Sequence, residues 1–278
     1  MQRWRHDIHA RPETAFEENR TSDKVAALLD GWGIEVYRNI GRTGVVGVLR
    51  CGTGKGMVGL RADMDALQIQ EENTFSHRSR ENGKMHACGH DGHTAMLLGA
   101  ARHLAENKGF DGTAVFIFQP AEEHGEGARA MIADGLFDRF PVDSVYAIHN
   151  FPSLETGTFA VRPGSIMAAE DNFEIVIIGV GHHAAMPHLG RDPIVIGAEI
   201  ITAMQSLVSR SLDPMDHAVV SFTEFVTNGT VNVVPGQVIL KGDTRSLTTA
   251  VQAHIESTMA RIVSGSCAAH GVHHEFHY

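Results

Sequence analysis

Short apolar runs alternate with amphipathic stretches through the first half of the chain, and this alternation constrains the fold more than any other feature. The segment ENRTSDKVAALLDGWG, residues 18–33, predicts a helix with Thr21 or Ser22 near its start and glycines at its end. TAMLLGAARHLAEN and EGARAMIADGLF predict further helices. Strands that alternate with helices are typical of an open, largely parallel α/β sheet.

Runs rich in valine, isoleucine and phenylalanine predict the strands of this half. GVVGVLR and GMVGLRA predict strands joined by the glycine-rich turn CGTGKG, which we interpret as a hairpin connection. TAVFIFQP is apolar without interruption, as expected for a strand that is buried on both faces. SVYAIHN predicts a second buried strand.

The rhythm changes at about residue 168. From there the chain predicts strand, helix, two strands, helix and strand, and this β-α-β-β-α-β order is the ferredoxin-like unit. We therefore expect an α/β protein with two domains, residues 1–167 and 168–278. The segments, in order, are DNFEIVIIGV, DPIVIGAEIITAMQSLVSRSL, HAVVSFTEFVTN, GQVILKGDTRSL, TTAVQAHIESTMARIVSGSCAAHG and VHHEFHY.

Charge and cysteine content exclude several partners. The net charge of −10 argues against nucleic acid or an anionic membrane, because both select clustered Lys and Arg. No apolar run approaches the roughly 18 residues that a membrane helix needs. Three scattered cysteines are too few for a disulfide framework and indicate a reducing, cytoplasmic location.

Ligand-type side chains follow one strand after another. Taken singly, the segment after each strand is typical of a hydrogen-bonded turn or of the start of a helix. In an open α/β sheet, however, the carboxyl ends of the strands meet at the ligand-binding edge, so their coincidence predicts a metal site. The side chains are Asp63 and Asp65, then Cys88, His90, Asp91 and His93, then Glu122 and Glu123, and finally His149.

The residue types indicate which metals and which chemistry. Cys88 and His90 are separated by Gly89 alone, so thiolate and imidazole can hold one cation or two neighbouring ones. A mixed thiolate, imidazole and carboxylate set favours Zn²⁺, Mn²⁺, Co²⁺ or Ni²⁺ over Ca²⁺ or Mg²⁺. Of the adjacent Glu122 and Glu123, one can bind metal while the other takes a proton from water, which is the chemistry of metal-assisted amide hydrolysis.

Five motifs together resemble the M20 metallopeptidases, and in particular their branch of N-acyl-amino-acid, hippurate and auxin-conjugate amidohydrolases. The similarity runs from RHDIHARPETAFEENRTS to the end of the chain. It implies a zinc-peptidase-like α/β catalytic domain with an inserted ferredoxin-like lid domain. The motifs are MHACGHDGHTAMLLGAA, FQPAEEHGEGARAMIADGLF, AIHN, HAAMPH and the pair GTVNVVP and GDTR.

The resemblance implies roles for individual residues of the first domain. Glu122 corresponds to the general base, and Asp65 to the buried acid that orients a ligand histidine; the correspondence of Asp63 is less definite. We expect Asp91, His93 and His124 to support the loop instead of binding metal. The ligands of a pair of divalent metal ions are, on this resemblance, Cys88, His90, Glu123 and His149.

In the lid, the resemblance implies that His183 stabilises the oxyanion and that Asn232 and Arg245 bind substrate. An arginine there suits a substrate carboxylate, since its guanidinium binds carboxylates bidentately. VGHH replaces the family's KGGH, which leaves His182 as the alternative to His183. The resemblance further implies a homodimer through the lid, and in some relatives the lid histidine serves the partner's active site.

Relatives are expected to continue beyond the ferredoxin-like unit with a part that completes the catalytic sheet and supplies one more histidine ligand. We find no counterpart of that part here, so we expect an incomplete catalytic domain and weak or absent activity of this chain alone. The leading hypothesis is hydrolysis of N-acyl amino acids. The alternatives are a metal-binding or interaction protein without turnover, and a dipeptidase of the same fold.

Overall fold

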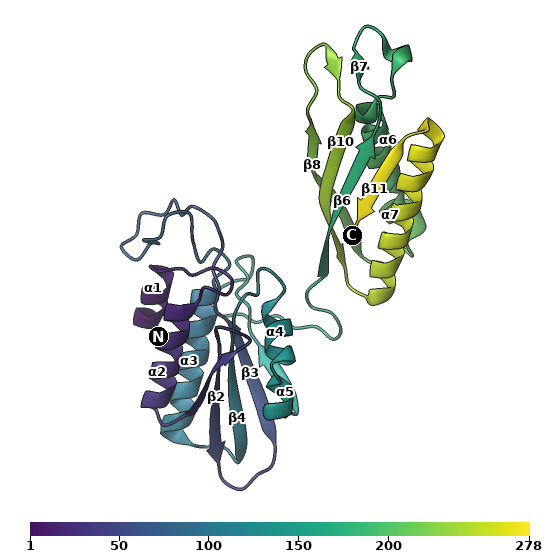
Figure 1. Ribbon diagram of the computed structural model, residues 1–278. Coiled ribbons are helices and arrows are strands. Elements are labelled where there is room, and N and C mark those ends of the chain that lie inside the picture. Colours follow the sequence, from purple (N-terminus) through teal and green to yellow (C-terminus); the bar gives the residue numbers. More distant parts are fainter. The chain divides into compact units, whose positions relative to one another are not determined.

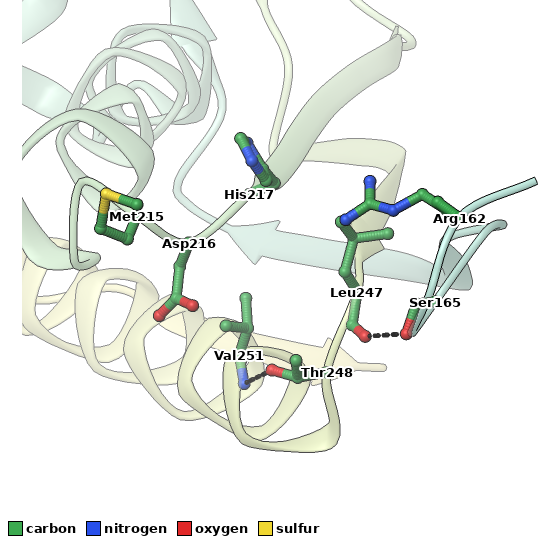
Figure 2. A pocket seen from close by; sticks show the side chains of 8 residues that line it. All are labelled: Arg162, Ser165, Met215, Asp216, His217, Leu247, Thr248 and Val251. Atoms are coloured by element: carbon green, nitrogen blue, oxygen red, sulfur yellow. Dashed lines mark hydrogen bonds between the residues drawn. The ribbon is translucent and has the colours of Figure 1, made fainter.

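The computed structural model describes residues 1–278, which form two units, Met1–Gly157 and Thr158–Tyr278 (Figure 1). The division precedes the boundary predicted after residue 167. The segment before that boundary belongs to the second unit because it packs there: Ser165 donates a 2.7 Å hydrogen bond to the carbonyl of Leu247. Arg162 and Ser165 also line a second-unit cavity of about 380 Å³ (Figure 2).

A five-stranded mixed sheet is the centre of the first unit. Its order is β1-β2-β4-β3-β5, and β4 pairs antiparallel with β2 and parallel with β3. Half of the strand pairs are therefore parallel, whereas a largely parallel sheet was predicted. The predicted hairpin between β2 and β3 is wrong, because β4 lies between these strands. The strands are β1 (Glu35–Ile40), β2 (Gly44–Cys51), β3 (Met57–Asp63), β4 (Gly112–Gln119) and β5 (Ser144–Ala147).

Helices cover both faces of this sheet, because β2 and β4 carry apolar side chains on both sides. Phe116 and Phe118 pack with α2 and α3, whereas Val115 and Ile117 pack with α4 and α5. β4 is buried along its whole length, as predicted. The helices are α1 (Gln2–His9), α2 (Asn19–Gly31), α3 (His90–Asn107), α4 (Gly127–Ala133) and α5 (Leu136–Arg139).

One local prediction for this unit is wrong and another is confirmed. β5, predicted to be buried, is exposed, with Tyr146 at 61% exposure, because it is an edge strand of the sheet. Thr21 and Ser22 lie near the start of α2, as predicted, and both are buried. The carboxylate of Glu13 accepts hydrogen bonds from the backbone N–H groups of Arg20 and Thr21 and satisfies donors that the helix leaves free.

The second unit has the predicted β-α-β-β-α-β order. Its four main strands form an antiparallel sheet in the order β11-β6-β10-β8, and α6 and α7 pack on it around an apolar core that includes Ile177, Ile200 and Ile255. Asp192 and Thr248 cap the two helices with their side chains. The elements are β6 (Ala169–Ile178), α6 (Pro193–Ser206), β8 (Ala218–Thr227), β10 (Gln237–Ser246), α7 (Thr249–His270) and β11 (His273–His277).

Short additional elements complete this unit. A two-stranded ribbon, which was not predicted, pairs β7 (His182–His183) with β9 (Val233–Val234). A 3₁₀ turn, η1 (Pro187–Leu189), follows β7, and a π-helical turn, η2 (Leu207–Ser211), extends α6. No helix of the protein combines the length and apolar character that crossing a bilayer requires.

Candidate metal centre

The predicted ligands of the first unit meet at one edge of its sheet. The parallel strands β3, β4 and β5 end there, and α3 begins there with His90. Nε2 of His90 lies 3.7 Å from Oε1 of Glu123, and Sγ of Cys88 lies 3.4 Å from Nε2 of His149. The ligand atoms of Cys88, His90 and His149 all lie within 4.8 Å of one another. Residues from three separate loops are thus close enough to share cations.

Two ligand atoms of this cluster are buried without a hydrogen-bond partner, namely Nε2 of His90 and Oε1 of Glu123. Such orphaned atoms carry a desolvation cost in a folded protein. Bound divalent cations would satisfy both atoms, and the mixed donor set of thiolate, imidazole and carboxylate suits a borderline metal. The residues present therefore fit a metal centre.

Asp65 holds the His90 ring by a hydrogen bond. Nδ1 of His90 donates to Oδ1 of Asp65 at 3.3 Å, so Nε2 is directed at the cluster, while Oδ2 of Asp65 accepts the backbone N–H of Glu123. Burial opposes a charge on His90, but the hydrogen bond to Asp65 and the nearby Asp63 outweigh it and raise the pKa of His90 to about 11. The same negative surroundings attract a metal cation.

His149 is oriented by its own neighbour. Its Nδ1–H donates to the carbonyl of Asn150 at 2.7 Å, which leaves the Nε2 lone pair facing Cys88. Gly89, between Cys88 and His90, has φ of +90°, and a Cβ there would collide with the Asn150 side chain. Glycine is therefore required at this position both by conformation and by space.

A strained turn places the glutamate pair. Ala121 has φ of +47°, which is costly for a residue with a Cβ, and its N–H donates to Oε1 of Glu18 at 2.9 Å. Glu18 is fully buried, and burial raises its pKa. The Glu122 side chain is 40% exposed, whereas that of Glu123 is 19% exposed. The Glu122 carboxylate is thus the more open of the two to solvent.

Asp63, His90 and His93 also bring ligand atoms within 4.8 Å. Asp63 is already engaged, however: it accepts a 2.6 Å hydrogen bond from Nδ1 of His93 and a 2.7 Å bond from Arg61. Burial raises the pKa of Asp63, but the hydrogen bond from His93 and the charge of Arg61 hold it well below its ordinary value. Because its oxygens have partners, Asp63 is a weaker ligand candidate than Glu123.

The predicted residues of the second unit lie in two separate places. His183 and Asn232 are neighbours in the β7–β9 ribbon, where the N–H of Ala184 donates to the carbonyl of Asn232 at 3.0 Å. Arg245 lies near the far end of β10, paired with Glu170 at 2.7 Å. Arg245 stands eight positions after Gln237, the residue of β10 close to the ribbon, which corresponds to roughly 27 Å along an antiparallel strand.

The alternative His182 is tied to its own ribbon, since its Nδ1 donates to the carbonyl of Val180 at 3.1 Å. Nδ1 of His183 accepts the N–H of Ala185, and its ring is otherwise exposed. His124 is exposed beside the glutamate pair. The cavity of Figure 2 includes none of these predicted residues; its Thr248 hydroxyl accepts the N–H of Val251 as the cap of α7.

Sequence reasoning missed several buried groups behind the cluster. Glu18 holds the turn before the glutamate pair, and His9 lies between the carboxylates of Glu71 and Asp91. Asp91, predicted only to support the loop, is fully buried. Single polar residues at helix ends carry no local pattern that marks them, so only a signal from long-range contacts could have found them.

Comparison with known proteins agrees with this geometry. The model of peptidase family M20/M25/M40 matches residues 59–277. A hippurate hydrolase from Campylobacter jejuni is 42% identical over 96% of this chain and 70% of its own length. An N-acyl-L-amino acid amidohydrolase from Geobacillus stearothermophilus is 43% identical over 99% of this chain and 74% of its own.

Solved structures give the same result. A putative aminohydrolase from methicillin-resistant Staphylococcus aureus superposes with a TM-score of 0.92 at 37% identity, over 99% of this chain and 74% of that one. A dinuclear metal-binding M20 peptidase from Bacillus subtilis superposes with a TM-score of 0.82 at 34% identity, over 99% of this chain and 72% of that one. The protein therefore belongs to peptidase family M20/M25/M40.

Proposed function

We propose that this protein is a metal-dependent amidohydrolase that cleaves the amide bond of N-acyl amino acids, such as N-benzoylglycine, into a carboxylic acid and an amino acid. The observation that carries the proposal is the pair of buried, unpartnered ligand atoms on His90 and Glu123 beside the solvent-facing carboxylate of Glu122. Similarity to amidohydrolases that are about two-fifths identical supports the reaction class.

In this proposal a pair of divalent cations is held by Cys88, His90, Glu123 and His149. When bound, they supply Lewis acidity toward the amide carbonyl and toward water. Zinc, manganese, cobalt and nickel all suit these ligands because their ligand preferences overlap. The cysteines of the protein are free, and the proposal includes a reducing, cytoplasmic location in which Cys88 stays free of disulfides.

Glu122 is the proposed general base. Its Oε2 lies 3.8 Å from Nε2 of His90, beside the ligands, and its exposure lets water reach it. The carboxylate takes a proton from the attacking water and then delivers it to the amide nitrogen as the C–N bond breaks. Asp65 keeps its hydrogen bond to His90 throughout and holds the ring in place.

The second unit supplies substrate contacts in this proposal and acts as a lid. The Arg245 guanidinium binds the free carboxylate of the amino acid, Asn232 binds substrate, and His183 donates to the oxyanion of the tetrahedral intermediate. Arg245 lies at the opposite end of β10 from the other two, so all three of one copy cannot contact one small substrate. A homodimer resolves this, with His183 and Asn232 serving the partner's site.

A surface for such a dimer exists in the second unit. β8 is an edge strand of the four-stranded sheet, and its Val219 and Val226 are 49% and 45% exposed. Free edge strands with exposed apolar side chains pair readily with another chain. We propose this edge as the dimer contact.

The test combines metal analysis with a substrate panel. The protein is loaded separately with zinc, manganese, cobalt or nickel, and amino-acid release is measured from N-benzoyl and N-acetyl amino acids and from dipeptides. Metal-dependent release from the acyl amino acids that is lost in Glu122→Gln supports the proposal. Release from dipeptides alone identifies a dipeptidase. Stoichiometric metal without any release identifies a metal-binding protein without turnover.

A separate variant tests the proposed contact between Arg245 and the substrate carboxylate. Arg245→Lys keeps the charge but loses bidentate binding. We expect it to raise KM for N-acyl amino acids with a free carboxylate and to leave the corresponding amides, whose carboxyl group is blocked, unaffected. An equal effect on both substrates would contradict the role given to Arg245.

A further inference from the structure

A buried histidine behind the ligand cluster bridges two carboxylates. His9, the last residue of α1, is 6% exposed. Its Nδ1 lies 2.9 Å from Oδ2 of Asp91, and its Nε2 lies 3.2 Å from Oε1 of Glu71. A carboxylate only accepts hydrogen bonds, so each ring nitrogen must carry a proton here. The geometry therefore makes His9 an imidazolium.

This cation joins three segments that are distant along the chain. Asp91 is the residue after His90 in the first turn of α3. The carboxylate of Glu71 also accepts the backbone N–H of Ser79 and the side-chain amide of Asn73, so it anchors the loop before α3. α1 itself packs against α3. His9 is thus the point at which α1, this loop and the start of α3 are held together.

One other side chain contacts Asp91, but more weakly. Arg5 also donates to Oδ2 of Asp91 at 3.1 Å, but its side chain is 56% exposed, which weakens the pair by solvent screening. Oδ1 of Asp91 is buried without any partner. Removing one partner of a buried ion pair leaves the other charge uncompensated, and the structure then shifts to hydrate it.

We propose that His9 is a positioning residue of the metal centre: its bridge between Asp91 and Glu71 fixes the first turn of α3 and thereby holds His90 where it binds the cation. The inference rests on the proposed metal centre. The hydrogen bonds of His9 go to Asp91 and Glu71 and not to a ligand atom of the cluster, so its effect is on metal affinity and on ligand geometry.

Two amide variants separate positioning from packing. The glutamine amide in His9→Gln reaches where Nε2 was and keeps a contact to Glu71, but it loses Asp91. The asparagine amide in His9→Asn replaces Nδ1 and keeps the contact to Asp91. The proposal ranks them: Gln weakens metal binding more than Asn. A packing role predicts the opposite order, because asparagine leaves the larger void beside Phe75 and His86.

The experiment measures cobalt affinity by competition with a chelator, together with the thiolate-to-cobalt absorption band of Cys88. We expect His9→Gln to weaken cobalt binding by about tenfold, as is common for groups that support metal ligands, and to reduce or shift the band. We expect His9→Asn to lose less cobalt affinity than His9→Gln. His6→Asn is the matched control on the same helix; His6 stacks on His77 and contacts no carboxylate, so its variant binds like the wild type.

Unchanged affinity and an unchanged band in His9→Gln would overturn the proposal, as would an equal loss in both amide variants. If His9→Gln does not fold, Glu71→Gln keeps the ring and removes one carboxylate, and wild-type affinity there also overturns it. Asp91→Asn gives a second check, since combining it with His9→Gln should add no further loss if both act through one contact. A wild-type protein that binds no cobalt refutes the proposed metal centre itself, and this inference with it.

Discussion

The two units of the protein bury very different side chains. The first unit buries ionisable groups along one edge of its sheet and behind it, whereas the buried polar residues of the second unit are Thr244, Ser246 and Thr258, none of which is ionised. Burying a charge is costly unless it is paired, so the first unit needs a dense network of partners. The buried ionisable groups are Glu18, Asp63, Asp65, Glu71, Asp91, His9, His86, His90 and His93.

The difference shows where each unit keeps its proposed chemistry. The first unit fixes its ligands from within, by hydrogen bonds such as that from His90 to Asp65. The second unit has an apolar core and carries His183, Asn232 and Arg245 on its surface. Side chains held by buried hydrogen-bond partners suit metal binding, while exposed groups suit contact with a substrate or with another copy.

The largest effect is expected from one substitution made in each unit. Glu122→Gln removes the proposed base, and general-base catalysis contributes about 10²–10⁴-fold, so we expect kcat to fall by that factor with metal still bound. Glu256→Gln, at an exposed position of α7, should leave kcat unchanged. Steady-state assays beside metal analysis check both. If Glu122→Gln kept the wild-type kcat, the first unit would not carry the general base, and this difference between the units would be lost.

Core truncations test whether the units are stabilised separately. Leu98→Ala in α3 and Ile255→Ala in α7 each create a cavity at a fully buried position, for a loss of about 2–5 kcal/mol. We expect Leu98→Ala to reduce amide protection in β3 and β4, and Ile255→Ala to reduce it in β6 and β10. Hydrogen exchange read by segment measures this. Loss of protection in both units from either variant would show that they unfold as one.

Metal should stabilise the first unit alone. At a free metal concentration 100 times its dissociation constant, binding adds about 2.7 kcal/mol to the unit that holds it. We expect slower exchange around β3, β4 and α3 on adding zinc and its reversal by a chelator, with β6, β10 and α7 unchanged. Cys88→Ser serves as the control with weakened binding. Protection gained equally in the second unit would contradict the comparison.

The smallest expected effect is a change in folding stability at acid pH. Burial raises the pKa of Asp7, but Lys24 and Arg20 outweigh it and lower the pKa from 3.8 to about 2. A carboxyl group with a depressed pKa stabilises the fold above its ordinary pKa, and that stability is lost as pH falls from about 4 to 2. The stability difference between wild type and Asp7→Asn should therefore shrink over this range. Thermal unfolding at several pH values measures it; a difference independent of pH would contradict it.

Pattern in the sequence was enough for much of the fold. The β-α-β-β-α-β order of the second unit was predictable because each element has its own apolar period and its own end signals, such as Asp192 before Pro193. The burial of β4 followed from its uninterrupted apolar run. The order of strands in the first sheet was not predictable, because β2 and β3 are close along the chain and yet each pairs with β4.

The candidate site was likewise predictable from the sequence only in part. Ligand-type residues at strand ends, and the glycine between Cys88 and His90, are visible in the sequence because the chemistry needs those residue types at that spacing. The contact between His9 and Asp91, and the support that Glu18 gives to Ala121, join residues more than 80 positions apart. No local pattern encodes such pairs, since any buried polar group can be satisfied by many partners.

The sequence by itself determined the types of element, the apolar core positions and the set of potential metal ligands, because these depend on local periodicity and on the chemistry of single side chains. Tertiary structure alone decided which ligand atoms are left without partners and which carboxylates are already engaged. It also decided that Arg245 and His183 lie at opposite ends of β10. These outcomes depend on burial and on long-range contacts, which exist only once distant segments pack together.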